Sequence, residues 1–115
     1  MLVVPDKLRT FDRGRPITPL DHLVADFKNP DSQRDLEHFR EWRTLVVPVP
    51  PELRESVAAK DQREGHDIHY HVWTYESFRV MIAWTGVNIT RWDAIWSHPG
   101  STAEDANEFY FVLKK

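Results

Sequence analysis

The chain has no cysteine among its 115 residues. Disulfide bonds and metal sites with thiolate ligands are therefore excluded. The absence is compatible with the cytoplasm, where disulfides are rare. We expect a cytoplasmic protein.

Long apolar runs are missing as well. The first apolar run, residues 2–4, stops at Pro5 and is far shorter than the apolar core of a signal peptide. No run approaches the roughly 20 residues that cross a bilayer. A net charge of −3 gives no general attraction to nucleic acid or to anionic membranes. We therefore expect neither a nucleic-acid partner nor a membrane partner.

What the sequence does contain is typical of a folded domain. Hydrophobic residues make up 41% of the chain and charged residues 29%, and both fractions lie near globular averages. The length suits one domain with a core of its own. We predict a single domain spanning residues 1–115.

The first half of the sequence predicts a short strand at residues 2–4 followed by two helices. Thr18 is expected to be the N-cap of the first helix, with Pro19 at its first position. Apolar side chains then recur at helical spacing in Leu20, Leu23, Val24 and Phe27. The second helix is expected to begin near Asp31. Residues 45–65 are rich in proline and polar residues, have weak helical character and are predicted to form a mobile, solvated excursion.

The second half predicts a helix and an edge strand. Thr74 is expected to cap a helix that ends at Gly86. Residues 88–98 alternate between the two faces of a strand, with Trp92 and Trp96 on the same face. We expect both tryptophans to pack on the helix.

The last segment predicts a loop and a final strand. Residues 99–107 are polar, with glycine and proline at the start, as is typical of a loop. Residues 109–113, FYFVL, form an uninterrupted apolar run. Such a run indicates a strand that is buried on both faces.

Two segments resemble a known enzyme family. The first is VVPDKLRTFDRGRPITPLDHLVADF, residues 3–27, and the second is DIHYHVWTYESFRVMI, residues 67–82. In this order they resemble the C-terminal half of class I, type-11-like S-adenosylmethionine-dependent methyltransferases. The similarity covers nearly the whole chain, and Lys7-Leu8 departs from the Lys-Arg pair usual at that point.

The resemblance implies an α/β fold of a partial Rossmann-like type. In that family the final strand lies between its two neighbours and runs antiparallel to both. We therefore expect a small three-stranded sheet with a central C-terminal strand and helices packed on it.

The family's cofactor-binding features are missing. Its members hold S-adenosylmethionine with a glycine-rich turn after the first strand and an acidic residue at the end of the second. The chain has four glycines, none of them in a G-x-G arrangement after a strand. The resemblance therefore implies the substrate-side half of a methyltransferase, which binds no cofactor by itself and is inactive alone. A truncated gene product, a split gene and a diverged remnant all remain open.

The segment HDIHYHVWT, residues 66–74, allows three interpretations. On an extended backbone His69 and His71 share a face, with Asp67 beside them. Such side chains can bind a divalent metal ion. The resemblance instead implies a catalytic base or substrate ligand at His69 or His71, with Asp67 as a substrate-binding residue. We favour a strand end leading into a helix cap, with the substrate-side role second, and predict no metal site.

Two further residues are candidates for substrate binding. Asp12 and Arg15 follow the first strand, and ligands of open α/β sheets bind beyond the carboxyl ends of strands. Arg15 is suited to hold an anionic group through its planar guanidinium. The alternative is an Asp-Arg pair that fixes a loop.

Partners are predicted from the first strand. If Leu2, Val3 and Val4 form an open strand edge, that edge is expected to recruit another chain. The partner would be a second copy or a complementary N-terminal half. The competing class of function is a non-catalytic binding or assembly module, with or without a histidine-bound metal.

Overall fold

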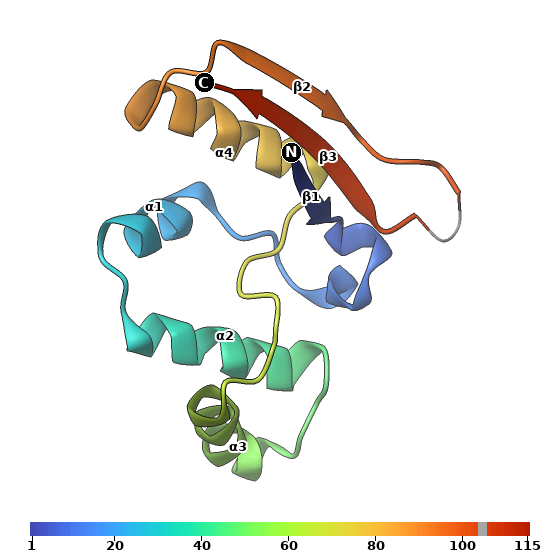
Figure 1. Cartoon of the computed structure of the whole chain (residues 1–115). Helices are drawn as coiled ribbons and strands as arrows, with labels where there is room; N and C mark the ends of the chain where they lie inside the picture. The colour runs from blue at the N-terminus through green and yellow to red at the C-terminus, as the bar shows by residue number, and fades with distance from the viewer. Residues whose placement is uncertain (104–105) are drawn as a thin grey trace. The chain divides into compact units, whose positions relative to one another are not determined.

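The computed structural model describes residues 1–103 and 106–115. The described chain falls into two compact units (Figure 1). The sheet unit comprises residues 1–13 and 73–115, and the helical unit comprises residues 14–72. Each unit is described by itself, and the single domain expected for residues 1–115 stays a prediction.

The sheet unit contains three strands, β1 (Leu2–Pro5), β2 (Ala94–His98) and β3 (Glu108–Lys114). Their order is β1-β3-β2, and β3 is antiparallel to both neighbours. Leu2 lies opposite Phe111, and Trp96 lies opposite Val112. The α/β class and the central, antiparallel C-terminal strand are thus confirmed.

The core of the sheet unit is aromatic and aliphatic. Its buried members are Val4, Phe78, Ile82, Phe109 and Phe111. Phe78 and Ile82 come from helix α4 (Tyr75–Asn88), which lies along the sheet in Figure 1. The ring centroids of Phe78 and Phe111 are 5.1 Å apart, within the range of favourable aromatic pairs. Alternate residues of β3 therefore bind helix α4 to the sheet.

The start of α4 is as predicted, and its end is not. Thr74 and Ser77 form a capping box, in which each side chain accepts a hydrogen bond from the other's backbone N–H. The helix continues through Gly86 to Asn88 instead of stopping at Gly86. A Cβ at Gly86 would lie 3.2 Å from Cδ1 of Trp92, so the glycine provides space for the indole ring.

The prediction for the edge strand was correct only at its end. The strand β2 begins at Ala94, not near residue 88. Trp92 precedes it and packs against the core, where its indole N–H donates to Oγ1 of Thr85. Trp96 is 56% exposed, so the expectation that it packs on the helix was wrong. Val112 is also exposed, which leaves β3 buried on one face only.

The helical unit contains α1 (Leu20–Lys28), α2 (Ser32–Leu45) and α3 (Pro51–Glu64). Asp31 caps α2 by accepting a hydrogen bond from the backbone N–H of Gln33. The buried apolar core is small and consists of Leu36, Phe39 and Ala58. Buried polar side chains accompany it, chiefly Arg15, His38 and Asp61.

Residues 52–65 form most of α3 instead of a weakly helical excursion. Pro51 occupies the first turn, and Gly65 ends the helix in the left-handed conformation with φ = 66°. Ala58 and Asp61 face inward and are buried. Asp61 accepts two hydrogen bonds from Arg43 of α2. The sequence pattern concealed this helix because a charged residue occupies one of its inward positions.

Thr18 does not cap α1, which has no side-chain cap. Instead, the Thr18 hydroxyl accepts a hydrogen bond from the backbone N–H of Val72 at 2.9 Å, and the Thr18 N–H donates to the Val72 carbonyl.

The predicted loop over 99–107 includes residues 104–105, which lie outside the described part of the chain. No helix formed by the described residues has the length and apolarity needed to cross a membrane.

Candidate metal centre

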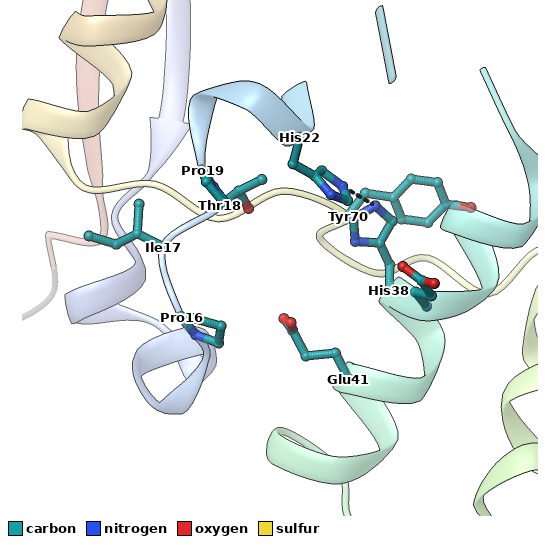
Figure 2. Close-up of a pocket in the computed structure, with 9 residues that line it drawn as sticks. Pro16, Ile17, Thr18, Pro19, His22, His38, Glu41 and Tyr70 are labelled. Carbon is teal, nitrogen blue, oxygen red and sulfur yellow. Dashed lines mark hydrogen bonds between the residues drawn. The ribbon is translucent and has the colours of Figure 1, made fainter. Parts of the chain in front are cut away.

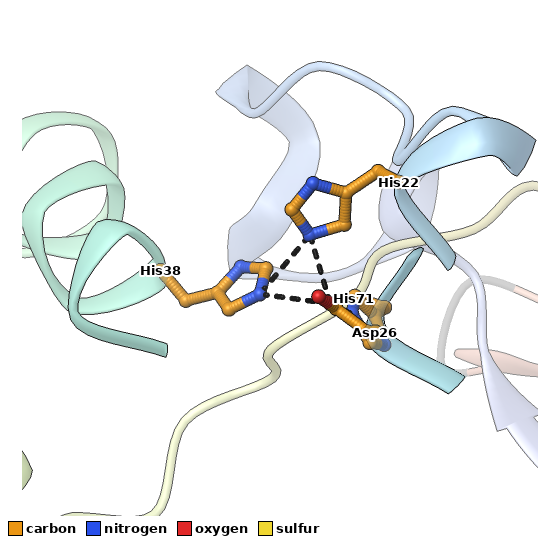
Figure 3. A group of neighbouring side chains, drawn as sticks. All are labelled: His22, Asp26, His38 and His71. Atoms are coloured by element: carbon orange, nitrogen blue, oxygen red, sulfur yellow. Dashed lines mark hydrogen bonds and ion pairs between the residues drawn. The ribbon is translucent and has the colours of Figure 1, made fainter. Parts of the chain in front are cut away.

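Four side chains of the helical unit converge on one point (Figure 3). His22 and Asp26 lie one turn apart on α1 and therefore share a face of that helix. His38 projects from α2, and His71 from the segment at residues 66–72, which is neither helix nor strand. One ligand atom from each residue lies within 4.8 Å of all the others.

The carboxylate of Asp26 lies at the centre of this group. Its Oδ2 atom is 3.0 Å from Nε2 of His22 and 2.9 Å from Nε2 of His71. Nε2 of His38 is 3.8 Å from the same oxygen and 3.3 Å from Nε2 of His22. All three imidazoles thus present the same ring nitrogen to one oxygen atom.

Arg34 fixes the other oxygen of Asp26. Its Nε donates a hydrogen bond to Oδ1, and a terminal nitrogen donates to the carbonyl of Asn29 at the end of α1. Burial acts to raise the pKa of Asp26, but hydrogen bonds from His71 and Arg34 outweigh it and lower the pKa to about 2. The carboxylate is therefore ionised at neutral pH, with Oδ2 directed at the histidines.

His38 is the most deeply placed of the three histidines. Its ring stacks on Tyr70 with a centroid separation of 5.3 Å and an interplanar angle of 12°. Burial, together with His71 and His22 nearby, lowers the pKa of His38 and favours its neutral form. A neutral imidazole is the form that binds a metal ion.

Side chains of neighbouring segments bind the backbone on both sides of His71. Arg15 is buried and donates to the carbonyls of His69 and Tyr70 at 2.6 Å and 3.0 Å. Its Nε also donates to Glu41 of α2 at 2.6 Å. Thr18 binds the backbone of Val72 on the other side. The position of His71 is therefore set by hydrogen bonds to its neighbours in the chain.

A pocket of about 280 Å³ adjoins the cluster. His22, His38 and Tyr70 lie together on one side of it, apart from Pro16 and Ile17 (Figure 2). The remaining lining residues are Thr18, Pro19, Glu37 and Glu41. The histidine cluster is therefore accessible from a cavity with both apolar and acidic walls.

The structure separates the residues that the sequence grouped together. His71 joins the cluster with Asp26, whereas His69 and Asp67 are not part of it. Asp67 is exposed and lines a different, shallow pocket.

The two other predicted residues have structural contacts. The guanidinium of Arg15 donates hydrogen bonds to Glu41 and to two backbone carbonyls. Asp12 is buried in a short 3-10 helix of the sheet unit. The predicted catalytic and substrate-binding roles stay predictions.

Three residues of the cluster were missed from the sequence. His22 and Asp26 carry a weak signal, because a histidine and an aspartate four residues apart on a helix face the same side. His38 carries none, since nothing in its neighbours indicates that α2 meets α1 at this point. Comparison with known proteins adds no further information: no protein-family model, no curated protein and no solved structure matches the chain.

Proposed function

We propose that the chain is the acceptor-side portion of an S-adenosylmethionine-dependent methyltransferase with a Rossmann-like sheet, located in the cytoplasm. The observation that carries the proposal is the strand order β1-β3-β2. Since β3 is antiparallel to both neighbours, β1 and β2 run parallel to each other. A C-terminal strand inserted in this way is the arrangement that the sequence resemblance implies.

The helical unit is suited to an acceptor-side role by its position in the sequence. It follows the carboxyl end of β1, and ligands of open α/β sheets bind beyond the carboxyl ends of their strands. Methyl transfer requires the acceptor atom to be held in line with the sulfonium methyl group, so the protein mainly positions the reactants. His69, His71, Asp12, Arg15 and Asp67 remain the proposed acceptor-side residues.

The cofactor-binding half would pair with β1. The described strands leave one edge of β1 unpaired, since its only strand partner is β3. Leu2 and Val3 are exposed there, while Val4 points into the core. An apolar strand edge of this kind recruits another strand. The occupant of this edge is a complementary half or, failing that, a second copy of the chain.

The test combines calorimetry with two matched edge variants. The chain is titrated with S-adenosylmethionine alone and after mixing with the separately produced cofactor-binding half of a type-11-like methyltransferase. We expect binding of S-adenosylmethionine only in the mixture. Val3→Lys should abolish it, because a charge on an edge strand blocks pairing. Ile95→Lys on β2 is the control: Ile95 is 47% exposed and Val3 50%, so it adds a similar surface charge away from β1 and should leave binding unchanged.

Two results would contradict the proposal. The first is micromolar binding of S-adenosylmethionine by the chain alone, which would require a complete cofactor site in these residues. The second is a mixture that gives no heat of binding with S-adenosylmethionine. This result would favour the competing class, a binding or assembly module without chemistry of its own.

A further inference from the structure

We propose that His22, Asp26, His38 and His71 form a binding site for one divalent transition-metal ion of the zinc class. The protein ligands would be Nε2 of the three histidines and Oδ2 of Asp26. This site is argued from the geometry of the helical unit and not from the methyltransferase proposal, but the two share His71. A His71 whose Nε2 binds a metal ion would not also act as the acceptor-side base, so that role would fall to His69.

The separations between the ligand atoms are close to those of a tetrahedral site. Zinc–nitrogen bonds of about 2.0–2.1 Å place the corners of a tetrahedron about 3.3–3.4 Å apart. Four of the six separations are 2.9 Å, 3.0 Å, 3.3 Å and 3.8 Å, and all six lie within 4.8 Å. Rotations of the side chains would have to bring the wider pairs together around a central ion.

The orientation of the rings supports the same arrangement. The three imidazole centroids are 5.0 Å, 5.1 Å and 5.6 Å apart, close to an equilateral triangle. The interplanar angles are 78°, 80° and 85°. Imidazoles that each direct one nitrogen at a common point have this geometry. Ordinary aromatic pairs also adopt near-perpendicular rings at these distances, so the convergence of the three Nε2 atoms carries the argument.

The ligand set selects the class of metal. Imidazole nitrogen suits zinc, cobalt, nickel and copper, while calcium and magnesium take oxygen ligands. Four protein ligands fill a tetrahedral ion, which is the pattern of structural zinc sites. Arg34 would act as a positioning residue, since its hydrogen bond to Oδ1 directs Oδ2 toward the ion.

The consequence for the helical unit is a cross-link. The ion would join α1, α2 and the segment at residues 66–72, which come from three separate parts of the sequence. The buried apolar core of this unit is small. Metal binding supplies folding free energy directly when the site forms only in the folded chain.

The test uses the full chain freed of metal by EDTA and dialysis, then titrated with CoCl₂ and ZnCl₂. Tetrahedral Co²⁺ gives visible absorption bands that octahedral Co²⁺ lacks. We expect one equivalent of Co²⁺ to produce these bands and one equivalent of Zn²⁺ to remove them. His22→Ala and His71→Ala should each weaken zinc binding by more than about 100-fold, and Arg34→Ala by about 10- to 100-fold.

A matched control separates the site from unspecific binding by histidine. His98→Ala removes a histidine from β2 in the sheet unit and should leave affinity and stoichiometry unchanged. Far-UV circular dichroism in EDTA must show that each variant folds like the metal-free parent. Weak binding, octahedral cobalt spectra, or equal losses in His22→Ala and His98→Ala would each overturn the proposal.

Discussion

The sheet unit and the helical unit are stabilised by different kinds of interior. The sheet unit buries five apolar side chains, three of them phenylalanines. Among the described residues, the helical unit buries four apolar side chains, only three of them in one cluster, and three polar ones, Arg15, His38 and Asp61. The sheet unit also buries two polar side chains, Lys7 and Asp12, but its apolar cluster is larger. Arg43 pairs with buried Asp61, and Arg15 with Glu41. An apolar interior depends little on solution conditions, whereas a polar one depends on every partner being present and correctly ionised.

The tryptophans allow the two units to be observed separately. Trp42 lies in the helical unit, and Trp73, Trp84, Trp92 and Trp96 lie in the sheet unit. A chain labelled with 5-fluorotryptophan therefore has one ¹⁹F resonance for the helical unit and four for the sheet unit.

The largest effect is expected from Phe109→Ala in the sheet unit. Phe109 is fully buried and contacts both Phe78 and Tyr75. Removing the ring should lower the free energy of unfolding by about 3–5 kcal/mol, because a cavity is left in a packed core. Urea unfolding followed through the four sheet-unit resonances measures the loss. Val112→Ala on the same strand is the control and should cost less than about 1 kcal/mol, since Val112 is exposed.

Asp61→Asn should have the next largest effect, and it should appear in the helical unit. It removes the buried charge that Arg43 holds at 2.6 Å. We expect a loss of about 2–3 kcal/mol, below the ~3–5 kcal/mol of a fully buried pair because Arg43 is partly exposed. Urea unfolding followed through Trp42 measures it. Glu55→Gln breaks the exposed pair with Arg40 between the same two helices and should change nothing measurable. Equal effects of the two variants would refute the comparison.

Acid should weaken the helical unit before the sheet unit. The hydrogen bond from Arg43 lowers the pKa of Asp61 below its ordinary value, although burial opposes this. A carboxyl whose folded pKa is lowered stabilises the fold above its unfolded pKa of about 3.9, and loses this contribution as the pH falls through the folded pKa. The Trp42 resonance should therefore broaden or shift below about pH 4, ahead of the other four. Simultaneous loss of all five tryptophan resonances would contradict the expected difference in acid stability between the two units.

The smallest effect is expected at the helix caps, and it should be similar in both units. Thr74→Ala removes the capping box of α4, and Asp31→Ala removes the N-cap of α2. Each should cost about 1 kcal/mol, because a cap satisfies backbone N–H groups regardless of the interior beside it. Thermal unfolding of the two variants side by side gives the measurement. A difference much larger than the cost itself would show that one cap also supports the packing of its unit.

The sequence predicted some local features of this fold and missed others. Thr74 and Asp31 begin helices as expected, because capping depends on residues within one turn of each other. Thr18 has the same local signal, yet its hydroxyl binds the distant backbone of Val72 instead of capping α1. The central place of β3 followed from its apolar run and the family resemblance. Trp96 was misplaced because alternation identifies a face of a strand without saying whether anything covers it.

The candidate site was predictable only in part. His71 was singled out because histidines are dense around it in the sequence. Its partners in the cluster come from α1 and α2, at positions that only tertiary packing brings together. Arg15 was expected to hold a ligand, yet its guanidinium binds backbone carbonyls of the segment before His71. Periodicity carries no information about such long-range hydrogen bonds.

The pairing of β1 with β3 also determines the order of folding during synthesis. Leu2 is opposite Phe111, so β1 cannot pair until the ribosome has made the residues up to β3. At 5–20 residues per second, the roughly hundred residues between them take about 5–20 s to make. Residues 14–72 form a compact unit of their own and can begin to fold during that interval. The apolar first strand stays exposed throughout it, and the sheet closes last.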